Sequence, residues 1–179
     1  MGVKVTQGVF HVIDKPDPAR PLSALTATKI PAADLLDTAG NVVEKGWKRT
    51  GVDHAFLQGY IGDDVLLSLQ YRVGSAIDAG IRWHIYGSEG EIEIVNNSTQ
   101  MYPFSPEDCT IRVKLHSEDK AEVVEMKRNP NVPEGIKGPA LDVWGLYDEY
   151  AKDGKYFDFD EAVERHVLLD DLETRANRV

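Results

Sequence analysis

Three side chains that can take part in proton transfer or anion binding lie close together in the segment RWHIYG, residues 82–87. Arg82, His84 and Tyr86 are spaced two residues apart, and side chains alternate between the two faces of a strand, so these three share one face. Together they could polarise a carbonyl group or move a proton. The same residue types are common at protein interfaces, so the types alone leave both uses open.

The two preceding predicted strands present a similar mixture. The segments HAFLQGYI, residues 54–61, and LLSLQYRV, residues 66–73, flank Gly62-Asp63-Asp64, which is typical of a hairpin turn. Alternation places most of their apolar side chains on one face and the polar and aromatic ones on the other, and we expect the apolar face to pack on helices. We predict catalytic roles for His54, His84 and Tyr86, and substrate binding by Arg72, Arg82, Gln58, Gln70, Tyr60 and Phe56.

Trp47 is a further candidate for substrate binding. With Lys48 and Arg49 it lies in a polar, glycine-containing segment, residues 31–53, which we interpret as a loop before the sheet. The loop could close over an anionic ligand, or Trp47 could pack on the edge of the sheet. We predict no metal, because no histidine or cysteine spacing indicates one, and no thiol nucleophile, because Cys109 has no activating neighbour.

The composition favours a soluble, intracellular protein. The 179 residues carry a formal net charge of −10, and their lysines and arginines are scattered, whereas phosphate binding needs clustered ones. The single cysteine excludes an internal disulfide and fits a reducing compartment. No apolar run approaches the ~20 residues of a spanning helix. We therefore expect a cytoplasmic protein with neither a nucleic-acid nor a membrane partner.

The order of the predicted elements indicates an α+β fold, with an open, mostly antiparallel sheet and two C-terminal helices packed on one face. Apolar spacing predicts a helix that stops at Gly154, and a capping box of Asp158 and Glu161 begins the next one. The expected apolar stripe of that second helix is Phe159, Val163, His166, Leu169 and Leu172, and on it His166 is a core histidine. We expect a single domain over 1–179, divided into an irregular N-terminal arm (1–21), the sheet (22–128), a linker (129–138) and the helices (139–179).

A set of short motifs extends from about residue 22 to the C-terminus. They are Asp53-His54, Gln58-Gly59, Arg72-x-Gly74, Trp83-x-Ile85-x-Gly87, Gly90-Glu91-Ile92, Asp158-Phe159, Ala162-Val163, Arg165-His166 and Leu168-Leu169. Together they resemble the C-terminal domain of Gal80-like members of the Gfo/Idh/MocA oxidoreductase family. The resemblance implies the fold already expected and a dimer interface on the open face of the sheet.

The sequence departs from the pattern of the family's enzymes, which carry an N-terminal Rossmann domain and a Glu-Lys-Pro motif. No G-x-G-x-x-G follows a strand here, and the nearest string to the second motif is Glu44-Lys45-Gly46. The resemblance therefore implies a substrate and dimerisation domain with no NAD(P) cofactor. The segment GVFHVID resembles the family segment in which a histidine donates a proton near the substrate, which makes His11 a fourth catalytic candidate.

Three functions remain open. The first is a cofactor-independent enzyme of the isomerase, cyclase or dehydratase (lyase) type, acting on a small, largely apolar natural product of secondary metabolism. The second is a non-catalytic Gal80-like module whose open face binds itself or a protein partner. The third is the substrate domain of a truncated NAD(P)-dependent oxidoreductase. Met1 and the proline-rich entry KPDPARP favour the first, with a small-molecule substrate and a homodimer formed through the open face.

Overall fold

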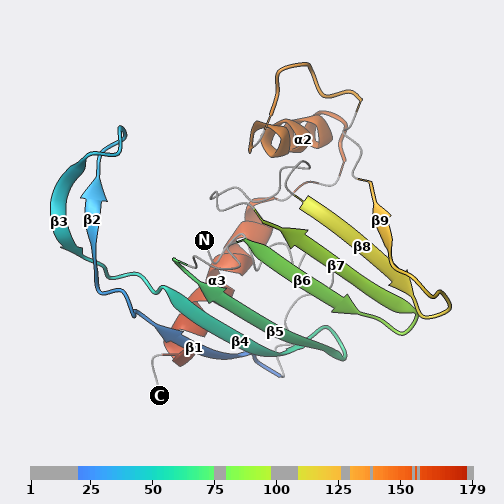
Figure 1. Cartoon of the computed structure of the whole chain (residues 1–179), viewed down its shortest axis with the longest axis horizontal. Helices are drawn as coiled ribbons and strands as arrows, with labels where there is room; N and C mark the ends of the chain where they lie inside the picture. The colour runs from blue at the N-terminus through green and yellow to red at the C-terminus, as the bar shows by residue number, and fades with distance from the viewer. Residues whose placement is uncertain are drawn as a thin grey trace. The chain divides into compact units, whose positions relative to one another are not determined.

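The computed structural model describes residues 20–74, 80–97, 109–125, 130–137, 139–154, 156 and 158–176. The chain divides into two compact units. The first combines Met1–Val73 with Asp158–Val179, and the second is Gly74–Phe157. Antiparallel strands precede two C-terminal helices, which confirms the α+β class (Figure 1).

The first unit contains a three-stranded antiparallel sheet in the order β1-β4-β5. Its strands are β1 (Ser23–Ala27), β4 (His54–Ile61) and β5 (Val65–Arg72). The register aligns Ala27 with His54 and His54 with Arg72, so residues two apart along each strand form rows across one face. This regular pairing is what lets period-2 reasoning assign the faces correctly.

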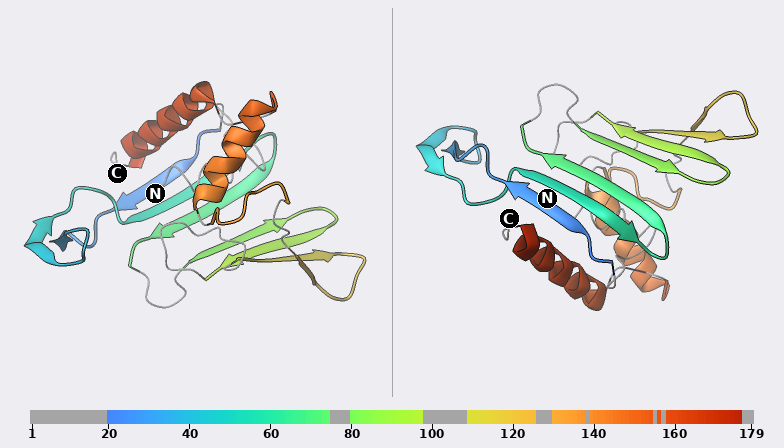
Figure 2. Two further views of the ribbon diagram at one scale, coloured as in Figure 1. Left: turned by 90° about the horizontal axis from the view of Figure 1, so that it is seen from above. Right: turned by 90° about the horizontal axis from the view of Figure 1, so that it is seen from below.

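One face of this sheet is covered by α3 (Phe159–Ala176), which packs against β1 (Figure 2). The predicted capping box begins this helix: Glu161 N donates to Asp158 Oδ1 at 2.9 Å, and Asp158 N donates to Glu161 Oε2 at 3.3 Å. The apolar core of the unit consists of Leu22, Leu57, Ile61, Leu67, Leu172 and Ala176, all less than 9% exposed. Burial of these side chains is the main favourable contribution to the stability of this layer.

The predicted apolar stripe of α3 is wrong in its first half. Phe159 and Val163 are 89% and 60% exposed, and His166 is also exposed instead of lying in the core. The face toward the sheet includes Arg165, whose side chain is buried, and Leu172. The helix carries apolar residues on more than one side, so periodicity alone selects the wrong stripe.

A two-stranded antiparallel ribbon is inserted between β1 and β4. It consists of β2 (Ala32–Leu36) and β3 (Val42–Lys48), and it extends beyond the end of the β1–β4–β5 sheet (Figure 1). Every residue of both strands is exposed. The prediction of a loop over residues 31–53 is therefore wrong for most of the segment. Because no side chain is buried, the alternation that reveals a half-buried strand is missing.

The second unit contains a four-stranded antiparallel sheet in the order β6-β7-β8-β9. The strands are β6 (Ile81–Tyr86), β7 (Gly90–Asn96), β8 (Cys109–Leu115) and β9 (Glu122–Val124). The unit also contains α2 (Pro139–Ala151), after which Asp153, with φ of 52°, turns the chain and Gly154 N donates to Glu149 O at 2.8 Å. Within the described residues, neither helix is long and apolar enough to cross a membrane.

Candidate functional site

The structure gathers most of the predicted binding residues on the face of the β1–β4–β5 sheet opposite the buried core, which we call the open face. Cross-strand pairing joins His54 to Arg72 and Phe56 to Gln70, and β1 adds Leu25 beside Phe56. The predicted site residues on this face are His54, Phe56, Gln58, Tyr60, Gln70 and Arg72. The open face is thus assembled from β1, β4 and β5, and alternation assigns the faces of β4 and β5 correctly. The third predicted strand, residues 81–86, belongs to a different sheet.

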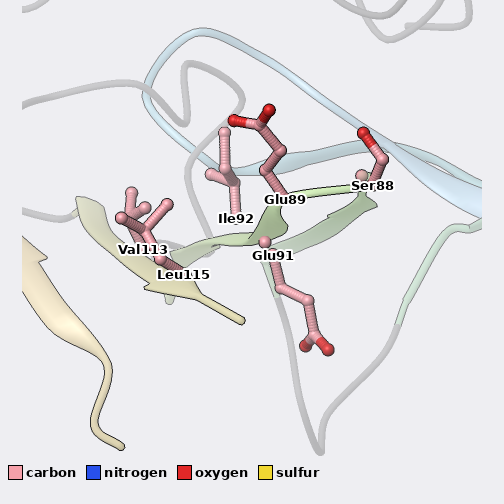
Figure 3. Close-up of a pocket in the computed structure, with 8 residues that line it drawn as sticks. Ser88, Glu89, Glu91, Ile92, Val113 and Leu115 are labelled. Atoms are coloured by element: carbon pink, nitrogen blue, oxygen red, sulfur yellow. The ribbon is translucent and has the colours of Figure 1, made fainter. Parts of the chain in front are cut away.

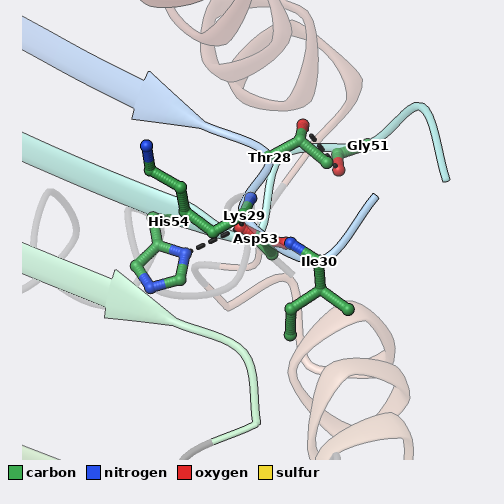
Figure 4. A network of polar contacts seen from close by, with 6 residues as sticks. All are labelled: Thr28, Lys29, Ile30, Gly51, Asp53 and His54. Atoms are coloured by element: carbon green, nitrogen blue, oxygen red, sulfur yellow. Dashed lines mark hydrogen bonds and ion pairs between the residues drawn. The ribbon is translucent and has the colours of Figure 1, made fainter. Parts of the chain in front are cut away.

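The most specific polar arrangement in this unit joins Asp53 and His54. His54 Nδ1 lies 2.7 Å from Asp53 Oδ1, and the Asp53 side chain is fully buried (Figure 4). The same carboxylate accepts hydrogen bonds from Lys29 N at 2.8 Å and Ile30 N at 2.6 Å. Three donors around one carboxylate supply the hydrogen bonds that a buried charge needs.

These bonds favour the ionised form of Asp53. The Lys29 amide is the main cause that holds the pKa of Asp53 well below its ordinary value, and the His54 hydrogen bond lowers it further. An ionised Asp53 accepts the proton on Nδ1, so Nε2 of a neutral His54 carries the free lone pair. That arrangement can accept a proton from a ligand on the open face.

Sequence reasoning selected His54 but assigned no role to Asp53. The signal available was the position of an acidic residue directly before the first residue of a strand that begins with histidine. Burial and the contacts with Lys29 and Ile30, residues 24 and 23 positions away, come only from tertiary structure. Asp53 is therefore a functional candidate that the sequence did not reveal.

Large apolar side chains flank the polar centre of the open face. Leu25 is 55% exposed and Leu66 is 73% exposed, while Phe56 and Tyr60 are each more than a third exposed. The Arg20 guanidinium lies 4.5 Å from the ring centre of Tyr60, which is a cation–π arrangement. Arg20 Nη2 also donates to Gly62 O at 3.3 Å, so it holds the Tyr60 ring and the β4–β5 turn together.

The remaining predicted catalytic residues form a different arrangement in the second unit. His84 Nε2 lies 3.5 Å from Glu93 Oε1, and Arg112 Nε donates to Glu93 Oε2 at 2.6 Å. His84 also stacks on Tyr86, with ring centres 6.1 Å apart. Glu93 on β7 therefore lies between His84 on β6 and Arg112 on β8, and this cross-strand contact accounts for the histidine on this face. Arg82 lies on the same face as His84 and Tyr86.

Two shallow hollows lie near the β6–β7 hairpin. The larger has a volume of about 330 Å³ and is lined by residues that include Glu89, Ile92, Val113 and Leu115 (Figure 3). Neither hollow is lined by a predicted catalytic or binding residue from the described part of the chain. Burial raises the pKa of the Cys109 thiol, which disfavours the thiolate.

Trp47 lies on β3 opposite Ala33 and is 50% exposed, so it belongs to the ribbon and not to a loop over the sheet. His11 lies outside the described residues. Across the described ranges, no group of three or more histidine, cysteine, aspartate or glutamate side chains could hold a metal ion.

Comparison with known proteins identifies this architecture. Residues 8–96 match the profile of the family described as Gal80p, C-terminal domain. The chain is therefore similar to the Gal80p C-terminal domain over residues 8–96. A search of curated proteins found no match.

Two solved structures have the same Gal80-like fold, and both are super-repressor mutants of Gal80p from Saccharomyces cerevisiae. The S2 mutant aligns with a TM-score of 0.65 at 15% identity, and the S0 mutant with 0.60 at 14%. Each alignment covers 88% of this chain but 42% of the Gal80p chain. The chain thus spans less than half the length of these Gal80p structures, and at this identity they establish its fold alone.

Proposed function

We propose that the chain is a cytoplasmic, Gal80-like binding module that pairs with a second copy of itself through the open face of the β1–β4–β5 sheet. One observation carries the proposal: Leu25 and Leu66 are 55% and 73% exposed on a regular sheet whose opposite face is buried. The unpaired Cys109 supports a reducing compartment such as the cytoplasm.

The side chains of the open face have the composition of an interface core. Protein interfaces favour aromatic residues and arginine over aspartate, glutamate and lysine. The described open-face residues include Phe56, Tyr60 and Arg72, and no carboxylate lies among them. In a chain of formal net charge −10, this absence sets the face apart from the rest of the surface. A two-fold contact brings the same face of both copies together.

Replacing Leu66 by Asp tests the proposal. The wild-type chain is expected to sediment with a mass near twice 19.9 kDa, and the variant as a monomer, because the new carboxylate would be buried in the contact. Val123→Asp, at a residue 68% exposed on β9, is the matched control and should leave the dimer intact. A wild-type monomer, or a Leu66→Asp variant that dimerises like wild type, would disprove this role.

The Asp53–His54 pair supports a second candidate function, a cofactor-independent isomerase, cyclase or lyase acting on a small, largely apolar natural product. His54 Nε2 would remove a proton from a carbon next to a carbonyl group and return it to another atom, so isomerisation needs no oxidant or reductant. Arg72, beside His54 in the register, would hold the oxygen that gains charge. Phe56 and Gln70 would contact the rest of the substrate.

Native mass spectrometry of the chain purified from its source tests this second function. A retained small molecule would supply the candidate substrate, and His54→Gln should then lower its turnover at least about 100-fold. His116→Gln, at an exposed histidine in the β8–β9 turn, serves as the control. Turnover that survives in His54→Gln would exclude His54 as the base, and a chain that retains no ligand would favour the binding module.

A further inference from the structure

The ribbon formed by β2 and β3 has a defined shape although it buries none of its side chains. At its tip, Asp37 Oδ1 accepts hydrogen bonds from Ala39 N at 2.9 Å and Asn41 N at 2.8 Å. Along its length, Gly46 N donates to Asp34 Oδ1 at 3.0 Å. At its base, Arg49 N donates to Pro31 O at 2.9 Å. These bonds define the tip and the base of the ribbon although none of its side chains is buried.

The root of the ribbon is fixed to the sheet by Asp53. The carboxylate of this buried residue binds the amides of Lys29 and Ile30, which lead from β1 into the ribbon. The Asp53 backbone adds two more bonds, since its N–H donates to Ala27 O at 3.1 Å and its C=O accepts from Val73 N at 2.9 Å. The ribbon therefore leaves the sheet in a direction set by a buried, hydrogen-bonded charge.

The exposed side chains of this ribbon are largely apolar. Val43 is 65% exposed, Leu36 54%, Trp47 50% and Val42 47%. Leu36 and Val42 are directly paired, so they form one apolar patch near the tip. A two-stranded ribbon is marginally stable by itself, and its outer edges offer unpaired backbone groups. A well-specified ribbon with apolar, uncovered side chains indicates a contact with another molecule.

We propose that this ribbon is an arm that packs on the open face of a second copy of the chain. This inference rests on the proposed dimer. The ribbon is inserted between Ala27 and His54, which are paired in the sheet, so it starts at the end of the open face itself. A second copy that packs on the open face comes within reach of the arm. Under two-fold symmetry each arm packs on the open face of the other copy, so a single contact buries both arms and both faces.

Charge supports a second copy as the occupant. The described open-face positions carry Arg72 and His54 without a carboxylate. The ribbon carries the acidic residues Asp34, Asp37 and Glu44 and, on β3, the basic residues Lys45 and Lys48. Asp34 and Asp37 bind the ribbon backbone. The Glu44 carboxylate makes no hydrogen bond or ion pair with any other residue that the structure describes. We assign it to Arg72 of the partner subunit, within an apolar contact made by Val43 and Trp47.

Charge reversal tests the pairing. Glu44→Arg and Arg72→Glu should each raise the dissociation constant of the dimer at least about tenfold, because each places like charges in the contact. The double variant restores opposite charges and should return within about threefold of wild type. Lys120→Glu, a reversal at an exposed lysine in the β8–β9 turn, is the control. Circular dichroism of each variant confirms that the fold is retained.

Two further readouts separate this inference from the proposed function. Val43→Asp should weaken the dimer as Leu66→Asp does, with Val123→Asp again as control. The emission of Trp47, obtained as the difference between wild type and Trp47→Phe, should shift to shorter wavelength on association. A dimer broken by Leu66→Asp but unchanged by Val43→Asp and Glu44→Arg would overturn the arm and leave the open-face dimer standing. A wild-type monomer would overturn both.

Discussion

The Nδ1 atom of His54 lies 2.7 Å from Oδ1 of the fully buried Asp53 side chain. The same carboxylate accepts the amides of Lys29 and Ile30 at the root of the ribbon. One residue therefore orients a histidine ring on the open face and sets the path of the chain into the ribbon. Substitutions at Asp53 and His54 separate these two effects, because His54→Gln leaves the amide bonds in place.

Asp53→Asn should loosen the root of the ribbon. The asparagine keeps one oxygen acceptor but turns an NH₂ group toward a backbone N–H, so one amide loses its partner. Hydrogen exchange at Lys29 and Ile30 should accelerate at least about tenfold. His54→Gln, the control, should leave their exchange close to wild type. Equal acceleration in both variants would show that the histidine, and not the carboxylate, holds the root.

The stability of the protein should depend on the charge of Asp53 at acidic pH. Its pKa in the folded chain lies below the ordinary value of 3.8, so the unfolded chain binds the proton more readily. The contribution of the carboxylate is fully present above about pH 5 and is lost as the pH falls through 4 and below. Urea unfolding from pH 6 to pH 2 should show a smaller loss for Asp53→Asn than for wild type. Parallel curves would contradict the hydrogen-bonded geometry.

The two faces of the β1–β4–β5 sheet should respond differently to truncation of leucine. Leu57 is 6% exposed and packs in the core, so Leu57→Ala should lower the free energy of unfolding by about 2–5 kcal/mol. Leu66→Ala, at a side chain 73% exposed, should change it by about 0.5 kcal/mol or less in the monomer. Chemical denaturation at low protein concentration measures both. Similar losses at the two positions would mean that the open face is covered within one chain.

The ion pair of Glu93 and Arg112 should contribute little to stability. Arg112 is 53% exposed, and water screens such pairs. A double-mutant cycle with Glu93→Gln and Arg112→Gln should give a coupling free energy of about 0.2–1 kcal/mol that falls with added salt. A much larger, salt-independent coupling would show that this face is buried in the assembled protein.

The sequence predicts regular, half-buried elements well. In β4, β5 and β6 large side chains alternate with polar ones, and the faces assigned from that alternation agree with the observed exposure. The capping box of Asp158 and Glu161 is equally local, since both of its bonds join residues three apart. These features depend on near neighbours in the chain, which a sequence displays directly.

Prediction from the sequence fails where the contact that determines the structure joins residues far apart in the chain, or where no such contact exists. The ribbon buries no side chain, so no pattern distinguishes β2 and β3 from a polar loop. Asp53 gains its importance from amides more than 20 residues away. The predicted apolar stripe of α3 includes Phe159, Val163 and Leu172, but the fold buries Leu172 and leaves the other two exposed. Each error follows from tertiary structure that overrides local propensity.

The insertion of the ribbon between two paired strands has an evolutionary consequence. Because Ala27 and His54 are paired where the ribbon leaves and returns, its length and sequence can change without shifting the register of the sheet. Mutations can therefore change the ribbon without changing the sheet. Related chains can acquire different binding partners in this way while their cores stay alike. The same property makes the ribbon a natural site for grafting a foreign hairpin.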